Sequence, residues 1–315
     1  MRRRVTLALA VWFAALWCAV FFRTETTAQS MVRAMLIEPR GGNWTIGLVY
    51  QFPQASADAS EAAAAIRFGC ASGTSFEQAL LAAEDTLPEA ANYRLCDHLL
   101  FGGESTLETL AACETSFLDR PLGRISARVF GADFSCADLL AASEEDDDTP
   151  ERLLEAIKAD ADYAPRLYEH RQGCLLPVFT LDTSRRAEGL LLSTNGEVEL
   201  SAEQAAAAWL LTGRGKTIAF QLDGTQVTLR ARWASIDALA DGCALRLYSR
   251  CRAGTPLPTQ AQCAALAALC DETVRLCWEQ GVDLLRLSAV RALHDGSLQT
   301  TKNACPLLRT DVVIF

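Results

Sequence analysis

The segment VRAMLIEPRGGNWTIGLVY, residues 32–50, decides the fold of this 315-residue chain. Residues 32–37 and 44–50 each follow the alternation of a β-strand, and the turn sequence PRGGN lies between them. Two such runs joined by a short glycine-containing turn predict an antiparallel hairpin. We therefore expect the folded body of the chain to start with two paired strands.

The residues after the hairpin predict alternating helices and strands. Ser75 is a suitable N-cap for a helix from Phe76 towards Leu87, and residues 97–102 are typical of a short buried strand. A second helix is expected over residues 106–118 and another strand over residues 125–130. Together with the hairpin, these elements predict an α+β domain over residues 31–142.

An acidic stretch, SEEDDDTP at residues 143–150, is the clearest candidate boundary in the chain. Its five consecutive carboxylates repel one another and cannot be packed, so we expect a solvated linker that leads into a helix at Glu151. A calcium site is the alternative, but the stretch lacks the glycine turn and the ligand spacing of calcium-binding loops.

Beyond the linker, the pattern predicts two further segments. Residues 151–222 form a middle α/β segment, with strands at 175–179, 187–192 and 217–222 and a helix at 201–211. Residues 223–315 form a C-terminal α+β domain, which begins with a turn at Asp223-Gly224. Its expected elements are strands at 226–233 and 244–251, a long helix at 259–280 and a final strand at 311–315.

The N-terminus carries an apolar run at residues 5–22, preceded by three arginines and closed by Arg23. At about 1.5 Å per residue, such a run spans roughly 27 Å as a helix, close to the hydrocarbon thickness of a bilayer. The arginines in front of it favour a cytoplasmic N-terminus and export of the remainder. We interpret residues 1–30 as an uncleaved signal anchor and expect a multi-domain α+β extracytoplasmic region with mixed or antiparallel sheets behind one membrane-anchor helix.

Two other interpretations of this segment stay open. Cleavage after Ala28, with the small residue Thr26 two positions earlier, would release a soluble protein. Alternatively, Cys18 is a lipidation site, although Trp17 is bulky for a lipobox and the apolar run continues beyond the cysteine.

Composition and charge limit the classes of function. The net charge of −10 argues against nucleic acid and anionic lipid surfaces, because phosphate binding needs a basic surface. Twelve cysteines are present, but without Cys18 the number is odd and the spacing gives no compact disulfide framework. Cys263, Cys270 and Cys277 recur every seven residues, and we expect them on the buried face of one helix as small apolar residues.

Motifs for chemistry are weak or incomplete. The segment GRGKT at residues 213–217 resembles the end of a phosphate-binding loop, but Leu210 stands where that motif needs glycine and a helix precedes it instead of a strand, so no nucleotide is expected. None of His98, His170 and His294 lies at metal-ligand spacing, and His98 is expected to be a structural histidine. We assign no catalytic, cofactor-binding or metal-binding residue, and binding or assembly is the stronger hypothesis.

Several segments then resemble one known family, in order along the chain. In the first half these are residues 32–38, 73–79, 98–104 and 117–120. In the second half they are residues 176–179, 188–192, 197–203 and 281–285. Their order and spacing resemble the Ger(x)C family of spore germination proteins over nearly the whole exported region.

That resemblance implies a non-enzymatic function. Members of the family are C subunits of germinant receptors on the outer face of the spore inner membrane, beside integral membrane A and B subunits. They are typically lipoproteins, and Cys18 lies near the position of their modified cysteine, so the membrane helix predicted here would replace the lipid. The alternative function is an extracytoplasmic small-molecule sensor with its pocket between the domains that flank the acidic linker. An envelope hydrolase is a third class.

Overall fold

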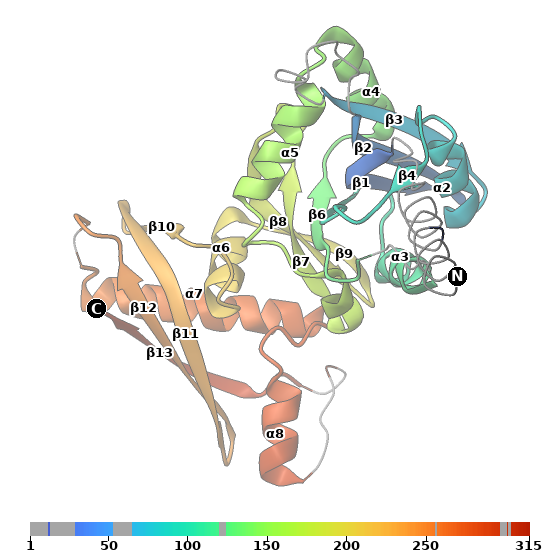
Figure 1. Ribbon diagram of the computed structural model, residues 1–315. Helices are drawn as coiled ribbons and strands as arrows, with labels where there is room; N and C mark the ends of the chain where they lie inside the picture. Colours follow the sequence, from blue (N-terminus) through green and yellow to red (C-terminus); the bar gives the residue numbers. More distant parts are fainter. Residues whose placement is uncertain are drawn as a thin grey trace, which may run out of the picture.

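The computed structural model describes residues 29–52, 65–119, 124–255, 257–296 and 304–315, together with the single residues Trp12 and Thr301 (Figure 1). Within these residues the chain forms a nine-stranded mixed sheet and a four-stranded sheet with packed helices, which confirms the predicted α+β class. Cys18 and the possible cleavage site after Ala28 lie outside the described residues, as does nearly all of the predicted anchor.

The predicted hairpin is confirmed. Strand β1 (Ser30–Arg40) pairs antiparallel with β2 (Asn43–Phe52), and Leu36 lies opposite Gly47. The turn between them is Gly41-Gly42, with φ of 55° and 83°. Two-residue hairpin turns of type I′ require positive φ at both positions, a conformation that glycine adopts without steric cost.

The large sheet is built around this hairpin. Its order is β3-β2-β1-β5-β6-β7-β8-β9, and the short strand β4 also pairs with β1. Strands β1, β5, β6 and β7 are parallel neighbours, whereas β3, β8 and β9 pair antiparallel. The bounds are β3 (Ala65–Gly73), β4 (Ala91–Asn92), β5 (His98–Phe101), β6 (Arg128–Ala132), β7 (Cys174–Phe179), β8 (Arg185–Ser193) and β9 (Gly196–Leu200).

Helices cover both faces of this sheet (Figure 1). Helices α2 (Phe76–Glu84) and α3 (Leu107–Asp119) pack on one face, in a core that includes Met35 and Ile37 of β1. Helices α4 (Cys136–Glu145) and α5 (Thr149–Ala159) pack on the other face, against Ala34 and Leu36. Side chains of a strand alternate between faces, so β1 is apolar at four consecutive positions, residues 34–37.

The acidic stretch at residues 143–150 connects α4 and α5. Glu144 and Glu145 belong to the last turn of α4, and the three aspartates that follow are exposed. Helix α5 begins at Thr149, two residues before the predicted start at Glu151, because Pro150 suits the first turn of a helix. The nine-stranded sheet includes strands from both sides of this stretch, and the predicted domain boundaries remain a prediction.

The four-stranded sheet follows in the last third of the chain. Its order is β10-β11-β12-β13, and the predicted turn at Asp223-Gly224 is confirmed between β10 and β11. One core joins this sheet to the large one, since it contains Leu191 of β8, Leu245 of β12 and Trp278. The bounds are α6 (Ala202–Leu211), β10 (Ile218–Leu222), β11 (Thr225–Leu239), β12 (Gly242–Cys251), α7 (Gln260–Glu279), α8 (Leu287–Asp295) and β13 (Leu307–Ile314), with the 3-10 helix η1 (Leu167–Gln172) before β7.

The cysteines in the described part of the chain are free thiols. Cys270 and Cys277 are completely buried on α7, as predicted, and Cys263, two helical turns before Cys270, is half-buried. Burial raises the pKa of the Cys270 and Cys277 thiols to about 12. A thiol that stays protonated at neutral pH is a poor nucleophile and metal ligand, so these cysteines act as small apolar side chains.

A glycine pair on β3 provides a test of the packing between β3 and α2. A Cβ atom on Gly73 would lie 2.5 Å from the backbone nitrogen of Ala79, whereas one on Gly69 would meet side-chain atoms, the nearest being the hydroxyl of Thr86 at 2.6 Å. We expect Gly73→Ala to lower the free energy of unfolding by about 1–3 kcal/mol, because backbone must move. Gly69→Ala is the matched control and should cost less. Urea unfolding of the two variants measures this, and equal losses would contradict the packing described.

Candidate functional site

The histidines lie in three separate places. His98 is buried on β5 and stacks on Phe130, with ring centroids 6.0 Å apart, and burial lowers its pKa. The Nδ1 atom of His170, in η1, contacts the carbonyl of Leu167 at 2.6 Å. His294 is exposed on α8. The described residues contain no group of three or more histidine, cysteine, aspartate or glutamate side chains placed to hold a metal ion.

The GRGKT segment is a turn between α6 and β10. Gly213 and Gly215 have φ of 67° and 78°, so both take the left-handed conformation. Arg214 binds back onto the protein, with Nη2 2.6 Å from the Glu169 carboxylate and Nη1 2.9 Å from the carbonyl of Ala164. Burial raises the pKa of Glu169, but the backbone N–H of Arg166 and the guanidinium of Arg214 outweigh it and leave that pKa lowered. The basic side chain thus serves a structural ion pair.

A first cavity, of about 440 Å³, lies beside the acidic stretch. The ends of β2 and β3 form one wall, and the α4–α5 connection forms the other. Four carboxylates and one guanidinium line it, so its charged side chains sum to −3. The carboxylates are those of Glu144, Asp147, Asp148 and Glu151, and the guanidinium is that of Arg67. We call this hollow the acidic cavity. Its charged groups are exposed, so solvent screens them and the cavity offers little desolvated recognition.

A second cavity, of about 410 Å³, lies between α6, β8 and the edge strand β10. Tyr163, Trp209 and Phe220 line it, with Arg185 and Glu203 as its charged groups. We call it the aromatic cavity. Apolar walls with a few convergent polar groups are typical of sites for small molecules. No sequence motif marks these residues, because they come from distant segments that only the fold brings together.

Arg185 organises the wall of the aromatic cavity. Its guanidinium carbon lies 4.3 Å from the ring centroid of Tyr163 and 5.0 Å from that of Trp209, and the two rings meet edge to face. Its Nε lies 3.2 Å from the carboxylate of Asp160. A cation over aromatic faces is stabilised by their quadrupoles, more strongly where water is excluded. The indole N–H of Trp209 is buried and has no hydrogen-bond partner in the described part of the chain.

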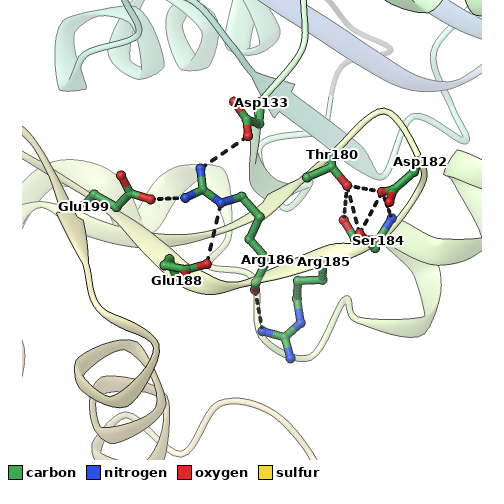
Figure 2. A network of polar contacts seen from close by, with 8 residues as sticks. All are labelled: Asp133, Thr180, Asp182, Ser184, Arg185, Arg186, Glu188 and Glu199. Atoms are coloured by element: carbon green, nitrogen blue, oxygen red, sulfur yellow. Dashed lines mark hydrogen bonds and ion pairs between the residues drawn. The ribbon is translucent and has the colours of Figure 1, made fainter.

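The next residue, Arg186, points the opposite way and joins β8, β9 and the residue that follows β6 (Figure 2). Its guanidinium lies 3.3 Å from Asp133, which follows β6, and 3.7 Å from Glu188 on β8, and it also pairs with Glu199 on β9. Figure 2 shows Arg185 directed away from these carboxylates, as the alternation of side chains along a strand requires. Arg186 therefore ties the edge of the large sheet together, while Arg185 serves the aromatic cavity.

The sites predicted from sequence have these outcomes. Cys18, the possible lipidation site, lies outside the described residues, and the absence of catalytic, cofactor-binding and metal-binding residues stays a prediction. The sensor hypothesis predicts a pocket between the domains that flank the acidic stretch, and the acidic cavity borders that stretch. In the part of the chain that the structure describes, none of the helices is both long and apolar enough to cross a bilayer.

Comparisons with known proteins give one structural similarity. No family model matches the chain, and no curated protein matches it by sequence. A solved structure titled "Crystal Structure of the GerBC protein" is similar with 10% sequence identity and a TM-score of 0.44. That alignment covers 89% of this chain and 96% of the GerBC chain.

The two adjacent arginines predict different costs of truncation. We expect Arg185→Ala to lower the free energy of unfolding by about 1–2 kcal/mol, through the loss of its contacts with two aromatic rings. Arg186→Ala, the matched control, should cost less than about 1 kcal/mol, because its partners are partly exposed, and added salt should shrink that cost. Thermal and urea unfolding at low and high salt measure both. A larger, salt-insensitive cost for Arg186→Ala would contradict this assignment.

Proposed function

We propose that this chain is a non-enzymatic, membrane-tethered subunit of a spore germinant receptor. In this proposal it scaffolds the integral membrane A and B subunits, or relays the nutrient signal with them, on the extracytoplasmic face of the spore inner membrane. The observation that carries the proposal is the collinear order of Ger(x)C-like segments from residue 32 to residue 285. Each segment is short, but their order and spacing together are restrictive.

Two of these segments meet in the fold and depend on one another. Residues 32–38 lie in β1, and residues 98–104 include β5, its parallel neighbour. Past the end of β5, the backbone N–H of Glu104 donates to the carbonyl of Pro39, at 3.1 Å. Gly103 has φ of 63°, and a Cβ there would lie 2.7 Å from the same carbonyl. The glycine in this segment therefore has a steric reason, which supports treating the resemblance as more than composition.

The tether gives this proposal its physical mechanism. A membrane anchor at residues 1–30 would confine the folded body to a thin layer beside its partners. Effective concentrations of tethered modules reach roughly millimolar, so weak interfaces suffice for assembly.

Germination of spores tests the proposal. We expect spores that lack the gene to lose their response to one class of nutrient, measured as the fall in optical density, while still germinating with a non-nutrient trigger. The full chain should restore the response. A variant exported with a cleavable signal in place of residues 1–30 should fold but fail to restore it, because it lacks the tether. Normal nutrient germination without the gene would contradict the proposal.

A second candidate function is an extracytoplasmic sensor of small molecules, favoured by the aromatic cavity. Ala206 lines that cavity on α6, so Ala206→Phe would fill part of it. If the chain is a sensor, a panel of small aromatic and apolar solutes should contain one that raises the melting temperature of the wild type and not of Ala206→Phe. Glu144→Gln, in the acidic cavity, is the matched control and should keep the shift. No shift with any solute would argue against the sensor.

A further inference from the structure

Strand β13 presents an unpaired edge. It is the last strand of the small sheet, and in the described part of the chain it pairs only with β12, in parallel (Figure 1). The N–H of Phe315 donates to the carbonyl of Ser249, at 3.1 Å, so odd-numbered residues direct their backbone groups towards β12. By the alternation of a strand, Leu308, Thr310 and Val312 direct theirs outwards.

The side chains of this edge are unusual for an unpaired strand. Leu307 is 55% exposed and Val313 is 37% exposed, on the sheet face opposite α7. An eight-residue strand with exposed aliphatic side chains and free backbone groups is a template for pairing with another chain. Arg309 and Asp311 lie between the two aliphatic residues, on the same face.

We propose that β13 pairs antiparallel with β13 of a second copy of this chain, about a two-fold axis at Thr310. The pairing would join two four-stranded sheets into one sheet of eight strands. It is isologous, since each copy contributes the same strand, and it closes at a dimer. This inference concerns the C-terminal sheet alone and does not depend on the proposed function.

Backbone geometry restricts the register. Outward-directed groups must meet outward-directed groups, so even-numbered residues must lie opposite even-numbered residues. An axis at Thr310 meets this condition, and Leu308 then lies opposite Val312 of the second copy. Axes at Arg309 or Asp311 also meet it, but they place two arginines or two aspartates directly opposite each other, which is destabilising.

Side-chain complementarity selects the axis at Thr310. In that register Arg309 of each copy lies opposite Asp311 of the other, which gives two ion pairs related by symmetry. Leu307 lies opposite Val313 in the same way and buries two exposed aliphatic contacts. These pairs occupy positions without backbone bonds across the new junction, where side chains approach most closely. The sequence LLRTDVV, residues 307–313, is therefore complementary to itself when reversed.

The existing ion pair of Arg309 does not oppose the pairing. Arg309 binds Asp241 of its own chain at 2.8 Å, but both side chains are about 60% exposed, and such pairs contribute little. Charges on an edge strand also guard against random pairing. Here the two charges have opposite signs around a central residue, so they disfavour the registers centred on Arg309 and on Asp311 and favour the one centred on Thr310.

A charge swap tests the proposal. The full-length chain in mild detergent is studied by sedimentation velocity over about a hundredfold range of concentration, with circular dichroism to confirm folding. We expect a dimer for the wild type and a dissociation constant raised about tenfold or more for Arg309→Asp and for Asp311→Arg, because like charges then face each other twice. The double variant Arg309→Asp/Asp311→Arg restores opposite charges and should return to a dissociation constant near that of the wild type.

Two further variants test the intrachain ion pair of Arg309 and the backbone pairing of β13 separately. Asp241→Asn removes the intrachain partner of Arg309 and should leave the dimer unchanged. Val312→Pro removes an outward N–H that the small sheet does not use, so this variant should fold and be monomeric. If the double variant is unfolded, Val312→Pro still tests the pairing of β13. A monomeric wild type, a folded double variant as weak as the single ones, or a dimer that persists in Val312→Pro would overturn the proposal.

Discussion

The fold depends on the burial of β1 on both faces. Met35 and Ile37 face the core under α2 and α3, and Ala34 and Leu36 face the core under α4 and α5. The part of a strand with helices on both sides must be apolar at consecutive positions, as residues 34–37 are, and it must have neighbours on both edges to satisfy its backbone groups. Here β2 lies on one edge and β5 and β4 on the other, so the strand is enclosed in every direction.

Some elements of the fold could be predicted from local sequence alone. The hairpin was predictable because Gly41-Gly42 provides its turn and both strands carry strong apolar runs. The starts of α2, α6 and α7 were also predictable, because Ser75, Ser201 and Thr259 each accept a hydrogen bond from a backbone N–H in the first turn. In these elements the local signal and the tertiary structure agree.

Other elements have no such local signal. Strand β3 contains small and polar residues, and it is a strand because it pairs along its length with β2. Strand β6 starts at Arg128, later than predicted, because only that segment reaches β5. Helix α8 has Arg286 at its N-cap position with φ of 57°, and Asp283 further upstream accepts the N–H groups of Leu287 and Ser288. The side chain that caps α8 therefore does not come from the residue directly before the helix, where a sequence pattern would place it.

The candidate sites also differ in whether the local sequence indicates them. Tyr163, Arg185 and Trp209 meet in the aromatic cavity although more than twenty residues separate each from the next, so no local motif could reveal them. The acidic stretch was visible in the sequence, but its place between α4 and α5 on the face of one continuous sheet was not. The functional proposal therefore relies on the order of many short segments, and the structure supplies steric reasons for some of them.

Accessibility of the folded body in intact cells tests the central claim most directly. Leu293 is 90% exposed on α8, so Leu293→Cys places a reactive thiol on the surface, and the wild type measures labelling of the other cysteines. A tethered extracytoplasmic body predicts that a membrane-impermeant maleimide labels this variant in intact cells and that the labelled chain stays in the membrane fraction. Labelling only after lysis, with the chain in the soluble fraction, would contradict the account.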